Sequence, residues 1–246
     1  MAGAFPTLRF VFPRVSREQR REIVAEWSRS LLRILAVEVV VEGPPPRPGA
    51  SMVAPNHVSW IDTFAIAAVH PTRFIAKSEI RDWPIAGWVA EKSGTIFIRR
   101  AKRHDTARIN EVVHAALAEG DCVGFFPEGT TSEGDKLLKF HSSLFEPAVA
   151  NNARVQPVAI RYEYPDGSLC RAASFTGTIS FAQSMGLLVR QKRVIARLRF
   201  ADPIEPAGLT RRDVARIAQE RVASLLGLPL PGSEPKPPSA PSAAPP

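Results

Sequence analysis

The chain has 246 residues, of which 45% are hydrophobic and 23% charged, a balance typical of one sizeable soluble globular domain. Its formal net charge of +8 favours phosphate-rich partners, either anionic lipid or nucleic acid, without choosing between them. The two cysteines, Cys122 and Cys170, lie far apart without a CxxC spacing, which argues against a disulfide framework and a metal site and suggests a reduced compartment.

The N-terminal residues carry no secretory signal, because Pro6 and Arg9 interrupt the short apolar run at the start. The longest uncharged segment, residues 172–189, holds too many polar and small residues to cross a bilayer. We therefore expect a cytoplasmic protein that contacts the inner membrane peripherally, on its cytoplasmic face.

Residues 17–35 predict an amphipathic helix with Ser16 as its N-cap. This helix packs on its own domain or, alternatively, lies on lipid with Trp27 at the level of the headgroups and its arginines on phosphates. On this pattern, residues 1–36 are assigned to an amphipathic membrane-associating region. The hydrophobic stripe consists of Ile23, Trp27, Leu31, Ile34 and Leu35.

Further along the chain, short apolar strands alternate with helical patterns, which predicts an α/β layered fold over residues 37–228. The predicted strands are Val37 to Val41, Met52 to Ala54, Arg73 to Ala76, Thr95 to Ile98, Val123 to Phe126, Val155 to Ile160 and Val194 to Phe200. The predicted helices lie near 60–69, 85–92, 104–119, 142–151 and 210–227. The proline-rich tail, residues 229–246, is predicted to be disordered because it cannot bury a core.

The first segment that carries chemistry is Asn56-His57 followed by Asp62. It stands between a predicted strand and a helical pattern, where ligands collect in α/β sheets. If the His57 ring folds back on Asp62, the carboxylate on one imidazole nitrogen raises the basicity of the other, and the pair can deprotonate an alcohol. The spacing alone is not specific, because His114 and His141 also have a carboxylate five residues later.

Two other segments offer polar groups at the ends of predicted strands. Phe126 to Ser132 contains a glycine turn whose amides and hydroxyls suit a phosphate, although an ordinary loop has the same composition. Residues 94–98 lead to a basic cluster that either clamps a phosphate or is a solvated charged loop. The cluster consists of Arg99, Arg100, Lys102 and Arg103.

In this order the segments resemble the lysophospholipid acyltransferase family, typified by 1-acylglycerol-3-phosphate acyltransferase. That family has an N-H-x-x-x-x-D block, a G-x-I-F-I-D-R block, an F-P-E-G-T-R-S block and a short V-P-V block. The matching segments here are Asn56 to Asp62, Gly94 to Arg100, Phe126 to Ser132 and Val155 to Ile160. The resemblance implies a glycerolipid acyltransferase-like α/β fold, a single domain in which helices flank a central mixed sheet.

The resemblance also implies a role for each matching residue. His57 would be the base that deprotonates the acceptor hydroxyl, and Asp62 would orient the imidazole and stabilise its charged form. The acceptor's glycerol phosphate would be held by Arg100, Glu128 and Gly129, and we expect Arg99, Thr130 and Thr131 to belong to the same substrate-binding site. The implied reaction transfers a fatty acyl group from acyl-CoA or acyl-ACP, used as co-substrate, to the free hydroxyl of a lysophospholipid, foremost 1-acyl-sn-glycerol-3-phosphate, which gives phosphatidate. No cofactor, metal or acyl-enzyme is implied, and the sequence has neither a clustered Cys/His set nor a G-x-S-x-G elbow.

Departures from the family pattern bear on the acceptor. Arg99 stands where the family has Asp, and Thr131 stands where it has Arg; Lys139-Phe140-His141 also replaces the usual Pro-Phe-Lys. A threonine hydroxyl does not replace the bidentate phosphate contact of an arginine. Lyso-ornithine lipid, which related bacterial enzymes of the family use, is therefore an alternative acceptor.

Three rival interpretations remain open at the level of sequence. A non-catalytic lipid-surface binding protein on the same fold would share the basic segments and the amphipathic helix. Nucleic-acid binding is suggested by charge alone, without a recognisable binding motif, and we expect no nucleic-acid partner. A serine nucleophile at Ser59 or Ser132 would lack the elbow that normally presents one.

Overall fold

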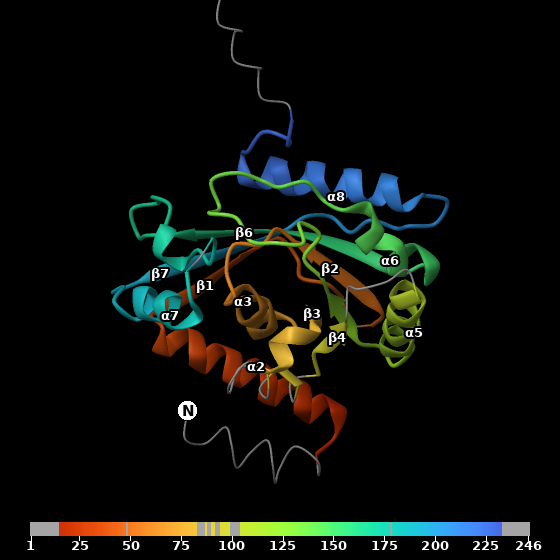
Figure 1. Cartoon of the computed structure of the whole chain (residues 1–246), viewed down its shortest axis with the longest axis horizontal. Coiled ribbons are helices and arrows are strands. Elements are labelled where there is room, and N and C mark those ends of the chain that lie inside the picture. Colours follow the sequence, from red (N-terminus) through yellow and green to blue (C-terminus); the bar gives the residue numbers. More distant parts are fainter. Residues whose placement is uncertain are drawn as a thin grey trace, which may run out of the picture.

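The computed structural model describes residues 15–47, 49–82, 87, 90–91, 94–98, 104–177 and 179–232. A seven-stranded mixed sheet forms the centre of this part of the chain (Figure 1). Its strands are β1 (Val37–Glu42), β2 (Ser51–Pro55), β3 (Thr72–Lys77), β4 (Ile96–Ile98), β5 (Cys122–Gly124), β6 (Arg154–Glu163) and β7 (Val194–Phe200). Their spatial order is β1-β7-β6-β2-β5-β3-β4, so the predicted α/β fold with a central mixed sheet is confirmed.

Strand direction brings distant parts of the chain to one edge of the sheet. Strands β2, β3, β4, β5 and β6 are parallel, whereas β7 pairs with β6 in the antiparallel sense and β1 runs parallel to β7. The first residues of β1 and β7 therefore lie at the same edge as the carboxyl ends of β2 and β6. This edge collects the chain segments discussed below.

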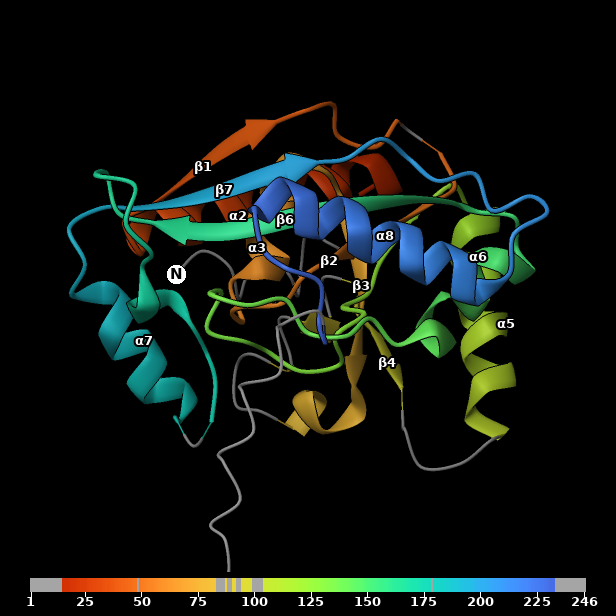
Figure 2. The same ribbon diagram turned by 90° about the horizontal axis from the view of Figure 1, so that it is seen from above.

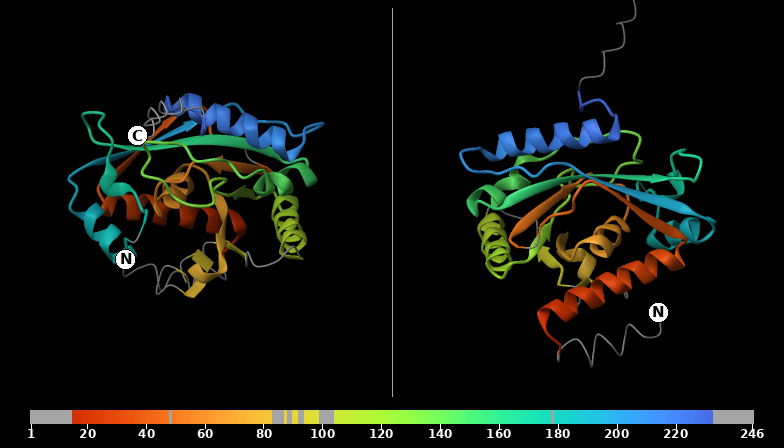
Figure 3. Two further views of the ribbon diagram at one scale, coloured as in Figure 1. Left: turned by 45° about the horizontal axis from the view of Figure 1, so that its top comes forward. Right: turned by 180° about the vertical axis from the view of Figure 1, so that it is seen from behind.

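Helices cover both faces of the sheet. They are α2 (Arg17–Ile34), α3 (Asp62–Val69), α5 (His104–Ala118), α6 (Glu146–Ala150), α7 (Phe181–Val189) and α8 (Arg211–Leu226), with 3-10 turns at η3 (Ser78–Asp82), η4 (Ser142–Phe145) and η5 (Arg171–Ala173). One hydrophobic cluster joins α5, α6 and α8 to the sheet, and a second joins α2, α3 and α7. Figures 2 and 3 show α8 on one face and α2 with α3 on the other.

Helix α2 packs on the domain and does not stand apart from it. Ser16 caps it together with Gln19 in a capping box, as the sequence predicts for the N-cap. Leu32 and the adjoining Leu35 are 1% exposed, and each buried leucine stabilises the packing by roughly 1.5–3 kcal/mol. Ile34, which the sequence assigns to the same stripe, is 59% exposed instead, because it falls on the far side of the last turn.

Helix α7 is the element that the sequence pattern misses. It lies within the uncharged run of residues 172–189, whose polar and glycine residues obscure the helical period. Ser180 and Gln183 form a capping box, a local signal that could have located its start.

In the described part of the chain, no helix has the length and hydrophobicity needed to cross a membrane.

Candidate active site

His57 and Asp62 meet at the carboxyl end of β2. The chain leaves β2 at Pro55, makes a short loop through His57, and enters α3 at Asp62. His57 Nδ1 lies 2.8 Å from Asp62 Oδ2, so the ring folds back on the carboxylate before the regular helix begins. Asp62 lies in the first turn of α3, at the positive end of the helix dipole.

The Asp62 carboxylate is fully buried and hydrogen-bonded on both oxygens. Oδ2 accepts the backbone amides of Val58 at 2.8 Å and Ser59 at 3.0 Å in addition to the His57 contact. Oδ1 accepts the hydroxyl of Tyr162 at 2.7 Å. Because a carboxylate only accepts hydrogen bonds, His57 Nδ1 carries the proton in this pair and Nε2 keeps its lone pair.

Tyr162 is a contact of Asp62 that sequence reasoning missed. It lies on β6, 100 positions from Asp62, and is 1% exposed. Burial, reinforced by the Asp62 charge, raises the pKa of Tyr162 well above its usual value, so the phenol remains a neutral hydrogen-bond donor. The sequence holds no local signal for this contact, because only the pairing of β6 with β2 brings the two residues together.

The His57 ring is held from one side by an aromatic stack. Its centroid lies 3.7 Å from that of Phe126 with an interplanar angle of 15°, and Phe126 stacks in turn on Phe74 at 5.4 Å. Gly124 makes room for this stack, because a Cβ at that position would lie 2.6 Å from the Phe74 ring. The imidazole side chain remains 20% exposed, which leaves it reachable by a substrate hydroxyl.

The glycine turn of the predicted Phe126 to Ser132 segment docks directly on the His57 loop. Gly129 adopts a φ of +70°, a conformation that glycine takes without steric cost. The Ser132 amide donates to the His57 carbonyl at 2.8 Å. Thr130 is exposed, whereas the Thr131 hydroxyl donates to the carbonyl of Phe175.

Glu128 is buried beside this site, with 2% of its surface exposed. Neither of its carboxylate oxygens makes a hydrogen bond of normal geometry with the described residues. Burial raises the pKa of Glu128 to about 8, and the Asp62 charge adds to the shift; the backbone amides of Leu138 and His57 act in the opposite direction. Glu128 is therefore predominantly a neutral acid at pH 7, beside the ionised Asp62.

The predicted basic cluster, Arg99, Arg100, Lys102 and Arg103, lies outside the described residues. Of the predicted site residues, the structure brings together His57, Asp62 and the loop of residues 128–131. Within the described ranges, no three His, Cys, Asp or Glu side chains are grouped as metal ligands.

Comparison with known proteins decides the family. A family model described as Acyltransferase matches residues 36–161. The chain belongs to this acyltransferase family. It is 40% identical over 203 residues to a lyso-ornithine lipid O-acyltransferase of Pseudomonas aeruginosa, covering 82% of this chain and 78% of that protein. It is 39% identical over 184 residues to a 1-acyl-sn-glycerol-3-phosphate acyltransferase of Neisseria meningitidis serogroup B, covering 74% and 72%.

The fold of this acyltransferase also resembles a solved structure. The LPA acyltransferase PlsC from Thermotoga maritima superposes with a TM-score of 0.67 at 23% identity, over 91% of this chain and 87% of that chain. The family match includes the His57 loop, the glycine turn and most of β6. The acyltransferase fold and the enzyme class expected from the sequence are thus confirmed.

The two serines that the sequence offers as rival nucleophiles are buried, and so are both cysteines. Ser59 is fully buried, and Ser132 is 4% exposed with its hydroxyl near the carbonyls of His57 and Lys136. Cys122 and Cys170 are free thiols, 4% and 1% exposed. Unlike these four side chains, the His57 imidazole beside the glycine turn is partly accessible, with 20% of its surface exposed.

Proposed function

We propose that this acyltransferase transfers a fatty acyl group from a thioester of coenzyme A or acyl carrier protein to the free hydroxyl of a lysophospholipid. The leading acceptor is 1-acyl-sn-glycerol-3-phosphate, and the product is then phosphatidate. One observation carries the proposal: an accessible imidazole whose Nδ1 is fixed on a buried, fully hydrogen-bonded carboxylate, next to a glycine turn. The names of the two bacterial relatives support the acceptor class.

In the proposed mechanism His57 is the general base. Nε2 takes the proton of the acceptor hydroxyl while its oxygen attacks the thioester carbonyl, and the buried Asp62 carboxylate stabilises the imidazolium that forms. The tetrahedral intermediate then collapses, the carbon–sulfur bond breaks, and the thiolate takes the proton back from His57. The new ester forms in one displacement, so the reaction needs neither an acyl-enzyme nor a metal ion or other cofactor.

The acceptor headgroup is assigned to the turn formed by residues 128–131 together with Arg99 and Arg100. A phosphate would meet the backbone amides around Gly129 and the exposed hydroxyl of Thr130. Glu128, neutral at pH 7, would not repel the phosphate and could donate a hydrogen bond in its protonated form.

Lyso-ornithine lipid is the second candidate acceptor. Thr131 stands where the family pattern has an arginine, and its hydroxyl is committed to the Phe175 carbonyl. A headgroup without a phosphate loses less from that change than lysophosphatidate does. The 40% identical relative from Pseudomonas aeruginosa, a lyso-ornithine lipid O-acyltransferase, supports this alternative.

A lipid acceptor places the enzyme at a membrane surface. We assign it to peripheral contact with an anionic membrane, on the cytoplasmic face, with no nucleic-acid partner. The net charge of +8 supports attraction to anionic lipid. A non-catalytic lipid-binding protein would bind the same vesicles without transferring an acyl group.

The test incubates the purified chain with a panel of lysolipids and both thioester donors, and identifies the products by mass spectrometry. His57→Ala should lower the rate by about 10²- to 10⁴-fold, the usual contribution of a general base, while circular dichroism reports an intact fold. His141→Ala is the matched control, because His141 is exposed and also has a carboxylate, Glu146, five residues later. A near-normal rate for His57→Ala would refute the mechanism, and vesicle binding without any product would favour the non-catalytic alternative.

A further inference from the structure

The pairing of β2 with β6 continues for one step beyond the end of β2, and the side chain of Asn56 makes that step. The two strands are parallel, with Pro55 opposite Val158, and the Asn56 amide still donates to the Val158 carbonyl at 3.3 Å. In a regular parallel ladder, the Ile160 amide would next donate to the Asn56 carbonyl, and the amide two residues after Asn56 would donate to the Ile160 carbonyl. Side-chain bonds take both places, because Asn56 Oδ1 accepts the Ile160 amide at 2.7 Å and Asn56 Nδ2 donates to the Ile160 carbonyl at 3.0 Å.

This exchange releases the Val58 amide for the candidate active site. Val58 is the residue whose amide a continued strand would direct to Ile160, but it donates instead to Asp62 Oδ2 at 2.8 Å. The same oxygen lies 2.8 Å from His57 Nδ1. Asn56 is 2% exposed, and its carboxamide satisfies backbone groups of Ile160 that would otherwise be buried without a partner. The chain can therefore fold His57 back on Asp62 without leaving β6 unpaired.

The same carboxamide holds the part of β6 that supplies the other oxygen of Asp62 with its donor. Ile160 and Tyr162 are two positions apart on β6, so their side chains lie on the same face of the sheet. A shift of Ile160 along β2 would move the Tyr162 hydroxyl, which donates to Asp62 Oδ1 at 2.7 Å. Asn56 thus secures the donors to both carboxylate oxygens, the Val58 amide on Oδ2 and the Tyr162 hydroxyl on Oδ1.

We propose that Asn56 is a positioning residue of the acyl transfer, which holds the His57–Asp62 pair in its reactive geometry through the backbone of Ile160. This role rests on the proposed function, because it takes His57 to be the base. Misplacing a reacting group by about 1 Å can cost on the order of 100-fold in rate. Loss of the two bonds to Ile160 should therefore lower kcat and leave acceptor binding at the glycine turn unchanged.

Asn56→Ala removes both bonds and is compared with the wild type on a short-chain lysophosphatidate dispersed as monomers, with both thioester donors. We expect kcat to fall by about 10- to 100-fold while the acceptor KM stays within about twofold. Gln156→Ala is the matched control, because Gln156 is another buried carboxamide on β6, 3% exposed, whose Nε2 donates to the Ala201 carbonyl. The control should lower the Tm and keep kcat. If Asn56→Ala also lowers the Tm and keeps kcat, Asn56 only stabilises the sheet and its positioning role is wrong.

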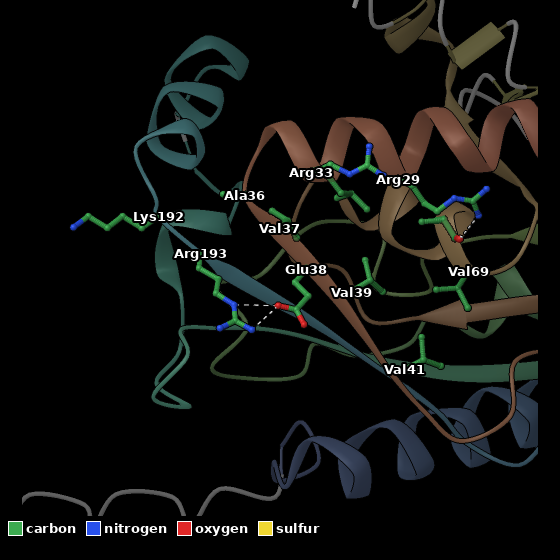
Figure 4. A pocket seen from close by; sticks show the side chains of 12 residues that line it. Arg29, Arg33, Ala36, Val37, Glu38, Val39, Val41, Val69, Lys192 and Arg193 are labelled. Atoms are coloured by element: carbon green, nitrogen blue, oxygen red, sulfur yellow. Dashed lines mark hydrogen bonds and ion pairs between the residues drawn. The ribbon is translucent and has the colours of Figure 1, made fainter.

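A second control is a side-chain contact at the exposed edge of the sheet. Glu38 on β1 pairs with Arg193 at 2.7 Å, and Figure 4 shows this ion pair beside the open groove along β1. Both side chains are more than half exposed, so the pair contributes little stability. Glu38→Gln should leave kcat and the Tm nearly unchanged. A loss of kcat as large as that of Asn56→Ala would show that any weakened contact at the sheet slows the enzyme, and it would overturn the role of Asn56.

Asn56→Asp offers a rescue that depends on pH. A protonated carboxyl keeps both bonds, because its hydroxyl can donate to the Ile160 carbonyl while its other oxygen accepts the Ile160 amide. An ionised carboxylate can only accept and repels the carbonyl, although burial favours the neutral form. The ratio of the variant's kcat to that of the wild type should therefore fall as the pH rises. A ratio that is constant with pH would overturn the role of Asn56, even if Asn56→Ala does not fold.

Proton NMR of the His57 ring reports on its position without turnover. The Nδ1 proton, which is held on the buried Asp62 carboxylate, should give the same downfield resonance in the wild type and in Gln156→Ala, and a shifted or broadened one in Asn56→Ala. An unchanged resonance in Asn56→Ala would contradict the positioning role. If the wild type transfers no acyl group to any lysolipid but only Asn56→Ala changes this resonance, the proposed function fails and the positioning of His57 by Asn56 stands.

Discussion

The His57–Asp62 pair and the glycine turn meet at the same edge of the sheet but are held very differently. Asp62 is fully buried and accepts four hydrogen bonds, and the His57 ring is stacked on Phe126. In the turn, Thr130 is exposed and both Glu128 oxygens lack a normal hydrogen bond among the described residues. The comparison teaches that the fold itself fixes the geometry of the proposed proton transfer. The proposed contacts with the acceptor depend instead on side chains that the fold constrains less.

Tyr162→Phe tests whether the buried contacts of Asp62 fix the geometry of the His57–Asp62 pair, and we expect it to have the largest effect of the substitutions below. It removes the hydroxyl that shares the Asp62 charge and leaves Oδ1 of a buried carboxylate without that donor. Hydrogen bonds to charged groups contribute about 1.5–3 kcal/mol, so kcat/KM should fall by about 10- to 100-fold. The loss is expected because Asp62 Oδ1, without its donor, no longer holds the carboxylate firmly in the orientation that keeps the His57 ring in place. Steady-state kinetics measures the change.

Tyr164→Phe is the control for that change, since Tyr164 bonds to Gln191 and not to Asp62. It should leave kcat/KM unchanged. An unchanged kcat/KM in Tyr162→Phe would mean that the phenol only fills space. In an Asp62→Asn background the Tyr162 substitution should produce no further loss of kcat/KM, which isolates the coupling between the two residues.

The contact between His57 and Asp62 could be predicted from the sequence, but the hydrogen bond from Tyr162 to Asp62 could not. His57 and Asp62 are five residues apart, so a strand-to-helix junction suffices to bring them together. The contact of Tyr162 with Asp62 spans 100 positions and depends on the register between β2 and β6, which no local pattern encodes. The alternation of strands and helices likewise predicted the layered fold, whereas α7 was missed because its polar residues hide the helical period.

The exposed side of α2 was beyond the sequence for a related reason. The stripe of residues 17–35 predicts one apolar side, but which of its members stay exposed depends on how α2 lies against α3 and the sheet. Ile34 is 59% exposed, whereas its neighbour Leu35 is 1% exposed.

Glu128→Gln tests whether the buried carboxyl of the glycine turn is neutral in the folded protein. The carboxyl holds its proton up to a pKa of about 8 in the folded protein, against an ordinary value of 4.5, so between these values the folded state binds more protons than the unfolded one. The stability of the wild type should therefore fall as the pH rises from about 4.5 to 8, and the neutral glutamine should remove that part of the slope.

Thermal unfolding of both proteins over this pH range is the measurement. The advantage of the variant in Tm should grow with pH, at about 2–4 °C for each kcal/mol. Glu133→Gln provides the matched control, because Glu133 is exposed and paired with Arg171. If Tm depends on pH identically in the wild type and in Glu128→Gln, the Glu128 carboxyl is ionised in the fold, and its neutral role beside the acceptor is wrong.

The smallest expected effect is a difference in acceptor KM between alanine substitutions at Thr130 and Thr131, two adjacent residues of the turn. Thr130 is exposed and is assigned to the headgroup, so Thr130→Ala should raise KM for the acceptor by about 2- to 10-fold, the value of one net hydrogen bond, with kcat unchanged. Thr131→Ala should instead lower the Tm and leave KM nearly constant, because the Thr131 hydroxyl holds the Phe175 carbonyl. Steady-state kinetics on a monomeric acceptor, paired with thermal unfolding, distinguishes the two. If the two substitutions change KM equally, both hydroxyls contact the headgroup, and the fold constrains the acceptor site more firmly than the comparison between the two regions implies.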